Sequence, residues 1–182
     1  NNKYLNTVIN NIPELLLILD KEGNYINIWT SKHEDLIKSE EELLGNNTYE
    51  VLPKDVAEIY RKNIRLALNN DEIRTFEYNL EIKGVRKYFE AKLISLELLE
   101  EKNNVLVIIR NITERIEKEK KLKDQKAYFK QLFENSIEGI ALLNNKEKVI
   151  KVNKKFSEIF GFSESELKGN YLDDFITPKN VI

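Results

Sequence analysis

The stretch Ser39-Glu40-Glu41-Glu42-Leu43-Leu44-Gly45 recurs 124 positions later as Ser163-Glu164-Ser165-Glu166-Leu167-Lys168-Gly169. Each copy predicts a short helix, because a serine followed three residues later by glutamate is a capping box and glycine suits the residue after a helix. The same offset aligns residues 4–54 with 128–178 without a gap, and 12 of these 51 pairs are identical. A period this long does not fit a solenoid repeat, so the pattern indicates two copies of one domain.

The second copy is expected to be incomplete. Ile182 corresponds to position 58 of the first copy, so counterparts of residues 59–113 are absent and we expect the sequence to be a fragment of a longer protein. Without those elements the apolar residues of the second copy cannot be covered by a sheet of their own. We therefore expect residues 127–182 to be poorly ordered or to borrow cover from another chain.

The spacing of apolar residues, one continuous apolar run at Leu15–Leu19 and the turn residues predict the remaining elements of the first copy. They are a helix at Tyr4–Asn11, strands at Glu14–Asp20 and Tyr25–Thr30, a long helix that begins at Pro53, strands at Thr75–Ile82, Val85–Leu96 and Val105–Arg110, and a charged loop at Leu99–Asn104. The carboxylates Glu77, Glu81 and Glu90 interleave with apolar residues on the outward face, where cross-strand ion pairing explains them better than acid–base catalysis.

A charge-dense segment follows the first copy. Ten of the 13 residues from Glu114 to Lys126 are charged, with no glycine or proline among them. A helix this polar is only marginally stable alone. We therefore favour a helix that pairs with a second helix in a coiled coil over a single solvated helix. Five apolar residues stand roughly at coiled-coil spacing for such pairing: Ile112, Ile116, Leu122, Phe129 and Phe133.

Composition removes many function classes. The chain of 182 residues has no cysteine and a single histidine, His33, which leaves no basis for a thiolate or multi-histidine metal site. A net charge of −2 argues against nucleic-acid and anionic-membrane binding. The longest apolar runs have five residues, far below the length of a membrane span. We expect a cytoplasmic protein that is not an enzyme and makes no membrane contact.

Several segments carry a resemblance to a known family. The turn Asp20–Asn24, the segment Glu42–Gly45, the strand Tyr88–Ala91 and the ending Val107–Arg115 resemble a PAS domain, and Phe160–Gly169 resembles the front half of another. The ending looks like the exit motif that leads into a signalling helix in this family. Its residues here are Asn111, Ile112, Thr113, Glu114 and Arg115, with Asn111 where the family usually has aspartate.

The resemblance implies an α+β fold with a five-stranded antiparallel sheet and short flanking helices. It also implies a complete PAS-like sensor domain at residues 1–113, a helical linker at 114–126 and the start of a second PAS-like domain at 127–182. Such domains act in multidomain signalling proteins, as homodimers, with histidine kinase, cyclic-dinucleotide or regulatory output domains.

The ligand site has to be argued from residues, since the fold does not fix it. Photosensors of this family that form a flavin adduct need a cysteine, so that chemistry is excluded. Haem relatives need an axial ligand, and His33 stands in a polar stretch that suits an exposed residue better. Non-covalent flavin or a small metabolite stays open. The candidate pocket residues, for each of which simple core packing is the favoured explanation, are Leu17, Trp29, Leu36, Leu44, Val51, Tyr60, Ile64, Phe76, Tyr78 and Phe89.

Two functional hypotheses follow. In the first, a small molecule binds the first PAS-like domain and the change passes through the linker helix to an output domain. In the second, the core is filled, no ligand binds, and the domain dimerises and relays strain. A small molecule released when the purified chain unfolds would favour the first hypothesis over the second.

Overall fold

The structure, a computed structural model, describes residues 7, 11–70, 72–98 and 101–177. The chain divides into two compact units, Asn1–Glu117 and Lys118–Ile182, called unit 1 and unit 2 below. The helix α5 (Thr113–Glu134) continues past both ends of the predicted linker, whose limits stay predictions. The helix expected at Tyr4–Asn11 lies almost entirely outside the described residues. None of the described helices is long and apolar enough to cross a membrane.

Unit 1 is built on a five-stranded antiparallel sheet, which confirms the predicted α+β fold. The strands stand in the order β2-β1-β5-β4-β3, so the last strand lies in the middle, between the first and the fourth. Their bounds are β1 (Leu15–Asp20), β2 (Tyr25–Trp29), β3 (Arg74–Ile82), β4 (Val85–Leu98) and β5 (Glu101–Asn111). Val107 of β5 stands opposite Leu17 of β1 and Leu93 of β4, which sets the register of the sheet centre.

The loop expected at Leu99–Asn104 is shorter than predicted. Strand β4 continues to Leu98 and β5 begins at Glu101, with Asn104 opposite both Leu96 and Asp20. The polar composition of this segment suggested a loop, but backbone pairing with a neighbouring strand does not depend on apolar side chains. Residues 99–100 lie outside the described part of the chain.

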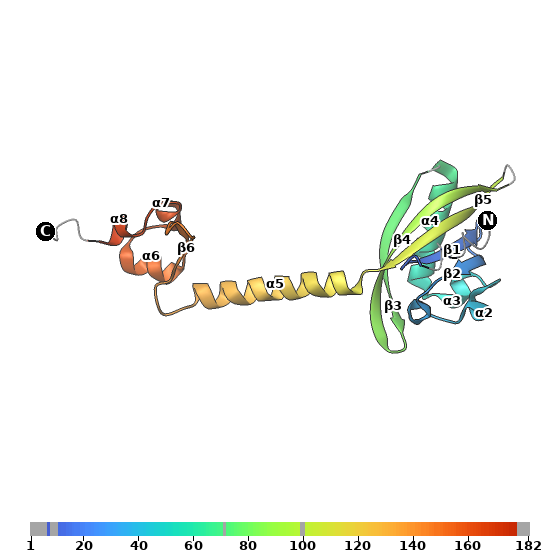
Figure 1. Ribbon diagram of the computed structural model, residues 1–182, viewed down its shortest axis with the longest axis horizontal. Helices are drawn as coiled ribbons and strands as arrows, with labels where there is room; N and C mark the ends of the chain where they lie inside the picture. Colours follow the sequence, from blue (N-terminus) through green and yellow to red (C-terminus); the bar gives the residue numbers. More distant parts are fainter. Residues whose placement is uncertain (1–6, 8–10, 71, 99–100, 178–182) are drawn as a thin grey trace. The chain divides into compact units, whose positions relative to one another are not determined.

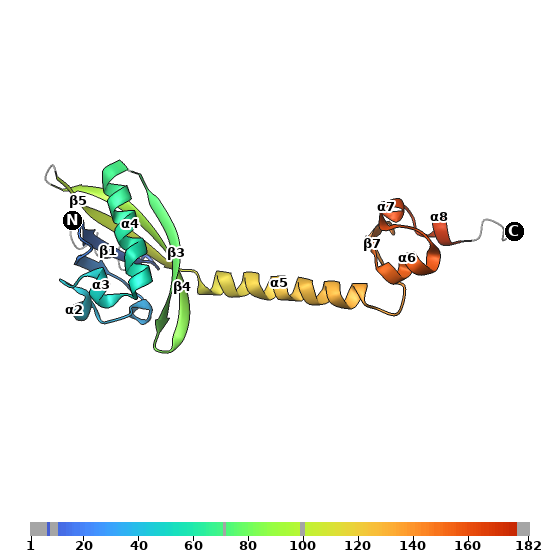
Figure 2. The ribbon, with the colours of Figure 1, turned by 180° about the vertical axis from the view of Figure 1, so that it is seen from behind.

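The described helices between β2 and β3 lie on one face of the sheet, and the opposite face, called the open face below, carries none of the described helices. The connection from β2 to β3 holds η1 (His33–Asp35), α2 (Glu40–Leu43), α3 (Thr48–Val51) and α4 (Lys54–Asn70). Figures 1 and 2 show α4 lying across the sheet. Its Tyr60, Ile64 and Ala67 are at most 2% exposed and pack in one core with the inward residues of the strands.

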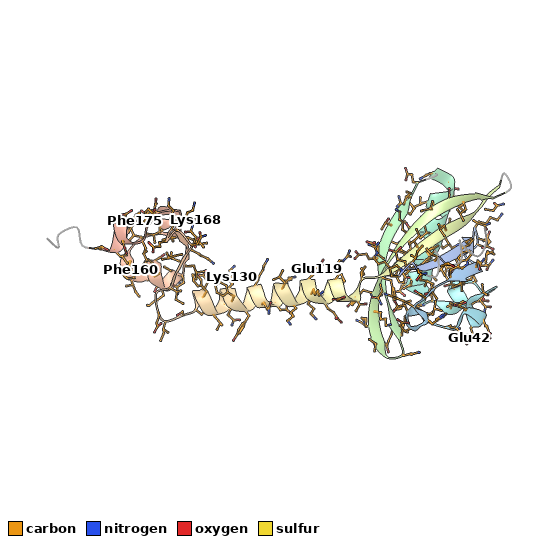
Figure 3. The ribbon with its side chains drawn as sticks, in the orientation of Figure 1. Glu42, Glu119, Lys130, Phe160, Lys168 and Phe175 are labelled. Atoms are coloured by element: carbon orange, nitrogen blue, oxygen red, sulfur yellow. The ribbon has the colours of Figure 1, made fainter. Side chains whose placement is uncertain are left out.

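Unit 2 contains the hairpin β6 (Ala141–Leu143) and β7 (Val149–Val152) with the short helices α6 (Lys154–Phe160), α7 (Glu164–Leu167) and α8 (Asp173–Ile176). Its core is small and is formed by Val149, Val152, Phe156 and Leu167. The labelled Phe160 in Figure 3 is 42% exposed. The structure thus defines helices and strands in unit 2. The poor order expected there from the sequence stays a prediction.

The duplication read from the sequence recurs in the hydrogen bonds. Gly45 N–H donates to the Tyr25 carbonyl at 2.9 Å, and Gly169 N–H donates to the Val149 carbonyl at 2.8 Å, 124 residues later. Both predicted capping boxes form. Hydrogen bonds from the Ser39 hydroxyl and backbone lower the pKa of Glu42, and Ser163 lowers the pKa of Glu166 in the same way.

Candidate functional site

The interior of unit 1 contains a small cavity between α4, the η1–α2 segment and the covered face of the sheet. We call it the interior site. Its volume is about 30 Å³, enough for one or two water molecules. Its walls are Leu15, Leu17, Tyr25, Asp35, Leu36, Ile37, Leu43, Leu52, Tyr60, Tyr78, Leu80, Phe89 and Ile109.

Alternation along the strands explains how these side chains meet. Leu15, Leu17 and Leu19 of β1 are buried, while the residues between them are only partly buried. Tyr78 of β3 stands opposite Phe89 of β4, so both rings project from the same face of the sheet. Tyr60 reaches them from α4, where it lies on the buried stripe of the helix.

Besides Asp35, three buried phenols supply polar groups to the wall of this largely apolar site. The Tyr60 hydroxyl donates to the Tyr78 hydroxyl at 2.9 Å, and their ring centroids lie 5.4 Å apart in an edge-to-face arrangement. Burial raises the pKa of Tyr60, Tyr78 and Tyr25 well above the usual range. All three are therefore neutral at physiological pH and act as hydrogen-bonding groups.

The structure brings half of the ten predicted pocket residues to the cavity wall. Five line it: Leu17, Leu36, Tyr60, Tyr78 and Phe89. Three others, Val51, Ile64 and Phe76, pack in the same core without lining the cavity. Whether any of them binds a ligand stays a prediction.

Two of the ten residues do not point inward. Leu44 is 43% exposed, whereas its neighbour Leu43 is 2% exposed and lines the cavity. The duplication held the signal, since Leu43 aligns with the identical Leu167 and Leu44 with Lys168. Trp29 follows the buried Ile28 and stands opposite Leu16, on the open face of the sheet, because successive strand residues point to opposite faces.

Sequence reasoning also missed Asp35, which links the wall of the cavity to the end of the sheet. Its Oδ1 pairs with Lys87 Nζ at 2.8 Å and accepts from Asn111 Nδ2 at 2.9 Å. The Asp35 side chain is 9% exposed and that of Lys87 20%. Asn111, which stands where the family usually has aspartate, is thus hydrogen-bonded to a carboxylate that Asp35 supplies. No spacing pattern in the sequence marks this pairing.

The remaining exit residues fasten the start of α5 to the sheet. Ile112 is buried and its N–H donates to the Tyr88 carbonyl at 2.8 Å, while the Thr113 hydroxyl accepts from Tyr88 N–H at 2.9 Å. Arg115 forms ion pairs with Glu77 of β3 and Glu90 of β4, so the partner of these two carboxylates comes from α5 and not, as predicted from the sequence, from a neighbouring strand. Glu114 is exposed beside them.

The side chains present do not suit a haem or metal site. His33 is 70% exposed, pairs with Glu40 at 3.2 Å and is not part of the wall of the interior site. Within the described ranges no group of three or more acidic or histidine side chains is arranged to hold a metal ion.

Comparison with known protein families assigns this architecture to a family. The PAS fold family matches residues 9–117, and a second PAS domain family matches residues 127–180. The chain belongs to the PAS family. PAS domains are sensory and signalling modules and generally are not enzymes.

Individual relatives agree with this assignment. Sporulation kinase E of Bacillus subtilis (strain 168) is 34% identical over 79 residues, which are 43% of this chain but 11% of that protein. The PAS domain of an HTR-like protein from Haloarcula marismortui matches with a TM-score of 0.50 at 24% identity, over 61% of this chain and 96% of that one. The PAS domain of Bordetella pertussis BvgS matches with a TM-score of 0.50 at 20% identity, over 70% and 97%. The two structures support the PAS fold.

Proposed function

We propose that unit 1 is the sensor of a longer signalling protein, binds a small molecule at the interior site and passes the change to α5. The observation that carries the proposal is the position of Asp35. Its segment forms part of the cavity wall, and its carboxylate holds Lys87 of β4 and Asn111 at the end of β5. A change at the cavity wall therefore acts directly on the residues that begin the signalling helix.

The size of the cavity determines how binding would couple to the exit. Ligand pockets usually measure several hundred Å³, so any molecule larger than water has to displace the wall that contains Leu36 and Ile37. Asp35 moves with that wall, and its bonds to Lys87 and Asn111 then differ between the empty and occupied states. A ligand shifts the balance by its preference for the open state.

The chemistry of the wall indicates the kind of ligand. Apolar side chains form most of the surface, and the Tyr60 and Tyr78 hydroxyls supply hydrogen bonds. This combination favours a small, largely apolar metabolite with one polar group over a flavin, whose ring system would require a far larger opening.

The test is mass spectrometry of whatever the purified chain releases on unfolding, followed by amide exchange with the molecule identified. We expect the ligand to change exchange at residues 111–116 in the parent chain, and Asp35→Asn to reduce that response when both chains are compared at saturating ligand. Glu34→Gln is the matched control, because Glu34 is exposed and contributes only its backbone carbonyl to Lys87. Release of nothing, together with no saturable binder among small metabolites, would reject the sensor.

The second candidate is a ligand-free dimerisation and relay module. Two observations favour it: the interior site is only about 30 Å³, and Leu122, Phe129 and Leu132 of α5 are 50–55% exposed. These side chains are spaced by seven and three residues, as in a coiled-coil seam. Sedimentation should give a homodimer that Phe129→Glu dissociates and Lys121→Glu does not. A monomeric parent chain would count against the relay.

We also propose a kinase as output domain, ahead of a cyclic-dinucleotide or regulatory domain. The support is the similarity to Sporulation kinase E, of which the chain spans about a ninth. In this proposal the protein acts in the cytoplasm, and this part of it neither catalyses a reaction nor contacts nucleic acid or membrane.

A further inference from the structure

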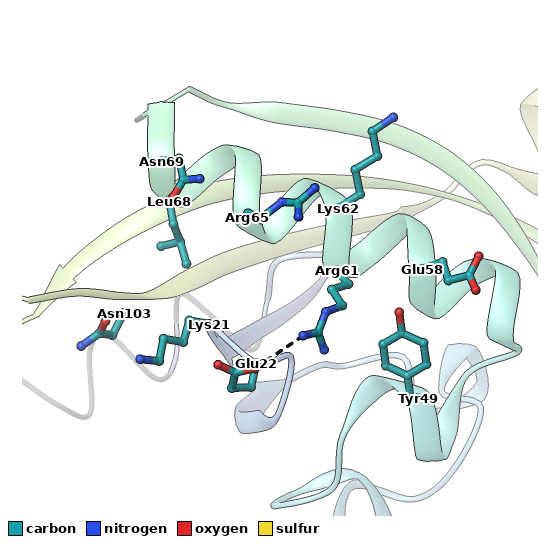
Figure 4. Close-up of a pocket in the computed structure, with 10 residues that line it drawn as sticks. All are labelled: Lys21, Glu22, Tyr49, Glu58, Arg61, Lys62, Arg65, Leu68, Asn69 and Asn103. Carbon is teal, nitrogen blue, oxygen red and sulfur yellow. Dashed lines mark ion pairs between the residues drawn. The ribbon is translucent and has the colours of Figure 1, made fainter.

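A second concave surface of unit 1 lies on the outer side of α4, away from the interior site. It measures about 580 Å³ and opens between α4 and the turn that joins β1 to β2 (Figure 4). This volume lies within the range of small-molecule pockets. Its lining is largely charged, so it would suit a different class of ligand from the interior site.

Positive charge is concentrated here against the trend of the chain. Lys21, Arg61, Lys62 and Arg65 line the cleft, with only Glu22 and Glu58 as carboxylates, so the local balance is two positive charges. The whole chain has a net charge of −2. A solvated helix face in such a protein would be expected to mix both signs more evenly.

Most of this charge is not neutralised within the fold. Arg61 lies 3.8 Å from Glu22, and both side chains are 58% exposed, so the pair is weak and screened by salt. Among the described residues no carboxylate is within ion-pair distance of Lys21, Lys62 or Arg65. Three cations are thus available to an anion that enters the cleft.

The spacing of these cations favours phosphate groups. Arg61 and Arg65 stand four residues apart on α4, which puts their Cβ atoms roughly 6 Å apart on one face of the helix. Guanidinium groups bind phosphate oxygens through two parallel hydrogen bonds. Tyr49, which is 40% exposed, adds an aromatic ring at the cleft margin. We propose that this cleft binds an organic molecule with two or more adjacent phosphate groups.

Calorimetric titration of the full chain with ATP, ADP and inorganic triphosphate tests the proposal. We expect saturable one-to-one binding at moderate ionic strength, weakened roughly tenfold or more by Arg61→Gln or Arg65→Gln, since a charge-assisted hydrogen bond is lost. Tighter binding of ATP than of inorganic triphosphate would show that the organic part also contacts the cleft. Tyr49→Leu should then remove that difference.

Arg86→Gln is the matched control, because it removes the same charge from an exposed position on β4 outside the cleft. Trp29 fluorescence during denaturation verifies that each variant keeps unit 1 folded. The proposal is overturned if no phosphate compound saturates, or if Arg86→Gln weakens binding as much as Arg65→Gln. Binding of a poly-glutamate peptide without binding of the phosphates would also overturn it and indicate an acidic protein partner.

Discussion

Units 1 and 2 begin with the same local structure and differ in what covers it. In unit 1 the opening hairpin joins three further strands and is packed under α4, with Leu19 and Val105 fully buried. In unit 2 the matching hairpin stands as a two-stranded sheet, and Leu143, the counterpart of Leu19, is 44% exposed. The hairpin and capping geometry is therefore specified locally, whereas the burial of its apolar face depends on distant elements.

The two units differ at the position where the second strand of the hairpin ends. Trp29 of unit 1 corresponds to Asn153 of unit 2, which is 0% exposed. Asn153 accepts from Ile140 and Phe156 N–H and donates to the carbonyls of Phe133 and Glu138, at 2.8–2.9 Å. Four hydrogen bonds of one buried polar side chain thus supplement the small apolar core of unit 2, whereas unit 1 has a much larger apolar core.

The largest difference in stability between the two units is expected in strong alkali. Because burial raises the pKa of Tyr25, Tyr60 and Tyr78, their contribution to stability is complete below pH 10 and is lost as the pH rises above it. Each phenol lowers the free energy of unfolding of unit 1 by up to about 1.4 kcal/mol per pH unit. The described part of unit 2 has no buried tyrosine.

Phenolate absorbance and Trp29 fluorescence, recorded together during alkaline titration, measure this effect. We expect the three phenols to ionise only as the fluorescence reports unfolding of unit 1. Tyr25→Phe should move the transition to higher pH, and the exposed Tyr49→Phe should leave it unchanged. Ionisation of all tyrosines before any change at Trp29 would contradict the prediction.

Truncation of the core is expected to have the next largest effect. Phe89 is 2% exposed and stacks on Tyr78 with ring centroids 5.6 Å apart. Phe89→Ala should lower the free energy of unfolding of unit 1 by about 3–5 kcal/mol. Trp29 is the sole tryptophan and lies in unit 1, so its fluorescence in a denaturant titration reports that unit alone. Phe160→Ala in unit 2 should leave this transition in place; a shift there would show that the units unfold together.

Much of this comparison was predictable from the sequence, because its causes are local. The continuous apolar run of β1, the Ser39 capping box and the repeat at Ser163 all predicted elements that the structure contains. The error at Leu44 came from reading one copy without the other, since Lys168 at the matching position marks an exposed residue.

The parts that could not be predicted depend on residues far apart in the chain. Asp35 meets Lys87 and Asn111 across 52 and 76 residues, and no periodicity links such positions. The volume of the interior site depends on how side chains of several elements pack, and the sequence specifies their character but not the space left between them.

Removal of the Asn153 side chain should destabilise unit 2 and leave the stability of unit 1 unchanged, the reverse of the effect expected for Phe89→Ala. Asn153→Ala leaves two N–H groups and two carbonyls without their partner, which should destabilise unit 2 by about 2–4 kcal/mol. The poor order predicted for unit 2 would make amide exchange at Gly139–Val152 faster than at Val105–Ile109. Asn153→Ala should accelerate it further, while the Trp29 transition stays unchanged. The exposed Asn135→Ala is the matched control. Unchanged exchange in Asn153→Ala would show that neighbouring groups replace these bonds.

The smallest effect concerns the turn before the second strand of each unit. Gly23 has a φ of +87°, and Glu147, 124 residues later, has a φ of +60°. A Cβ at Gly23 would lie 2.8 Å from Thr48 Oγ1, so Gly23→Ala combines left-handed strain with a clash and should cost unit 1 about 2 kcal/mol. Glu147→Gly relieves strain but gives the unfolded chain more freedom, so unit 2 should change by less than about 1 kcal/mol. Denaturation followed at Trp29 measures the first change and amide exchange the second. Equal changes in the stability of the two units would mean that rearrangement of the turn relieves the clash with Thr48. Both units would then owe this turn conformation to the backbone alone.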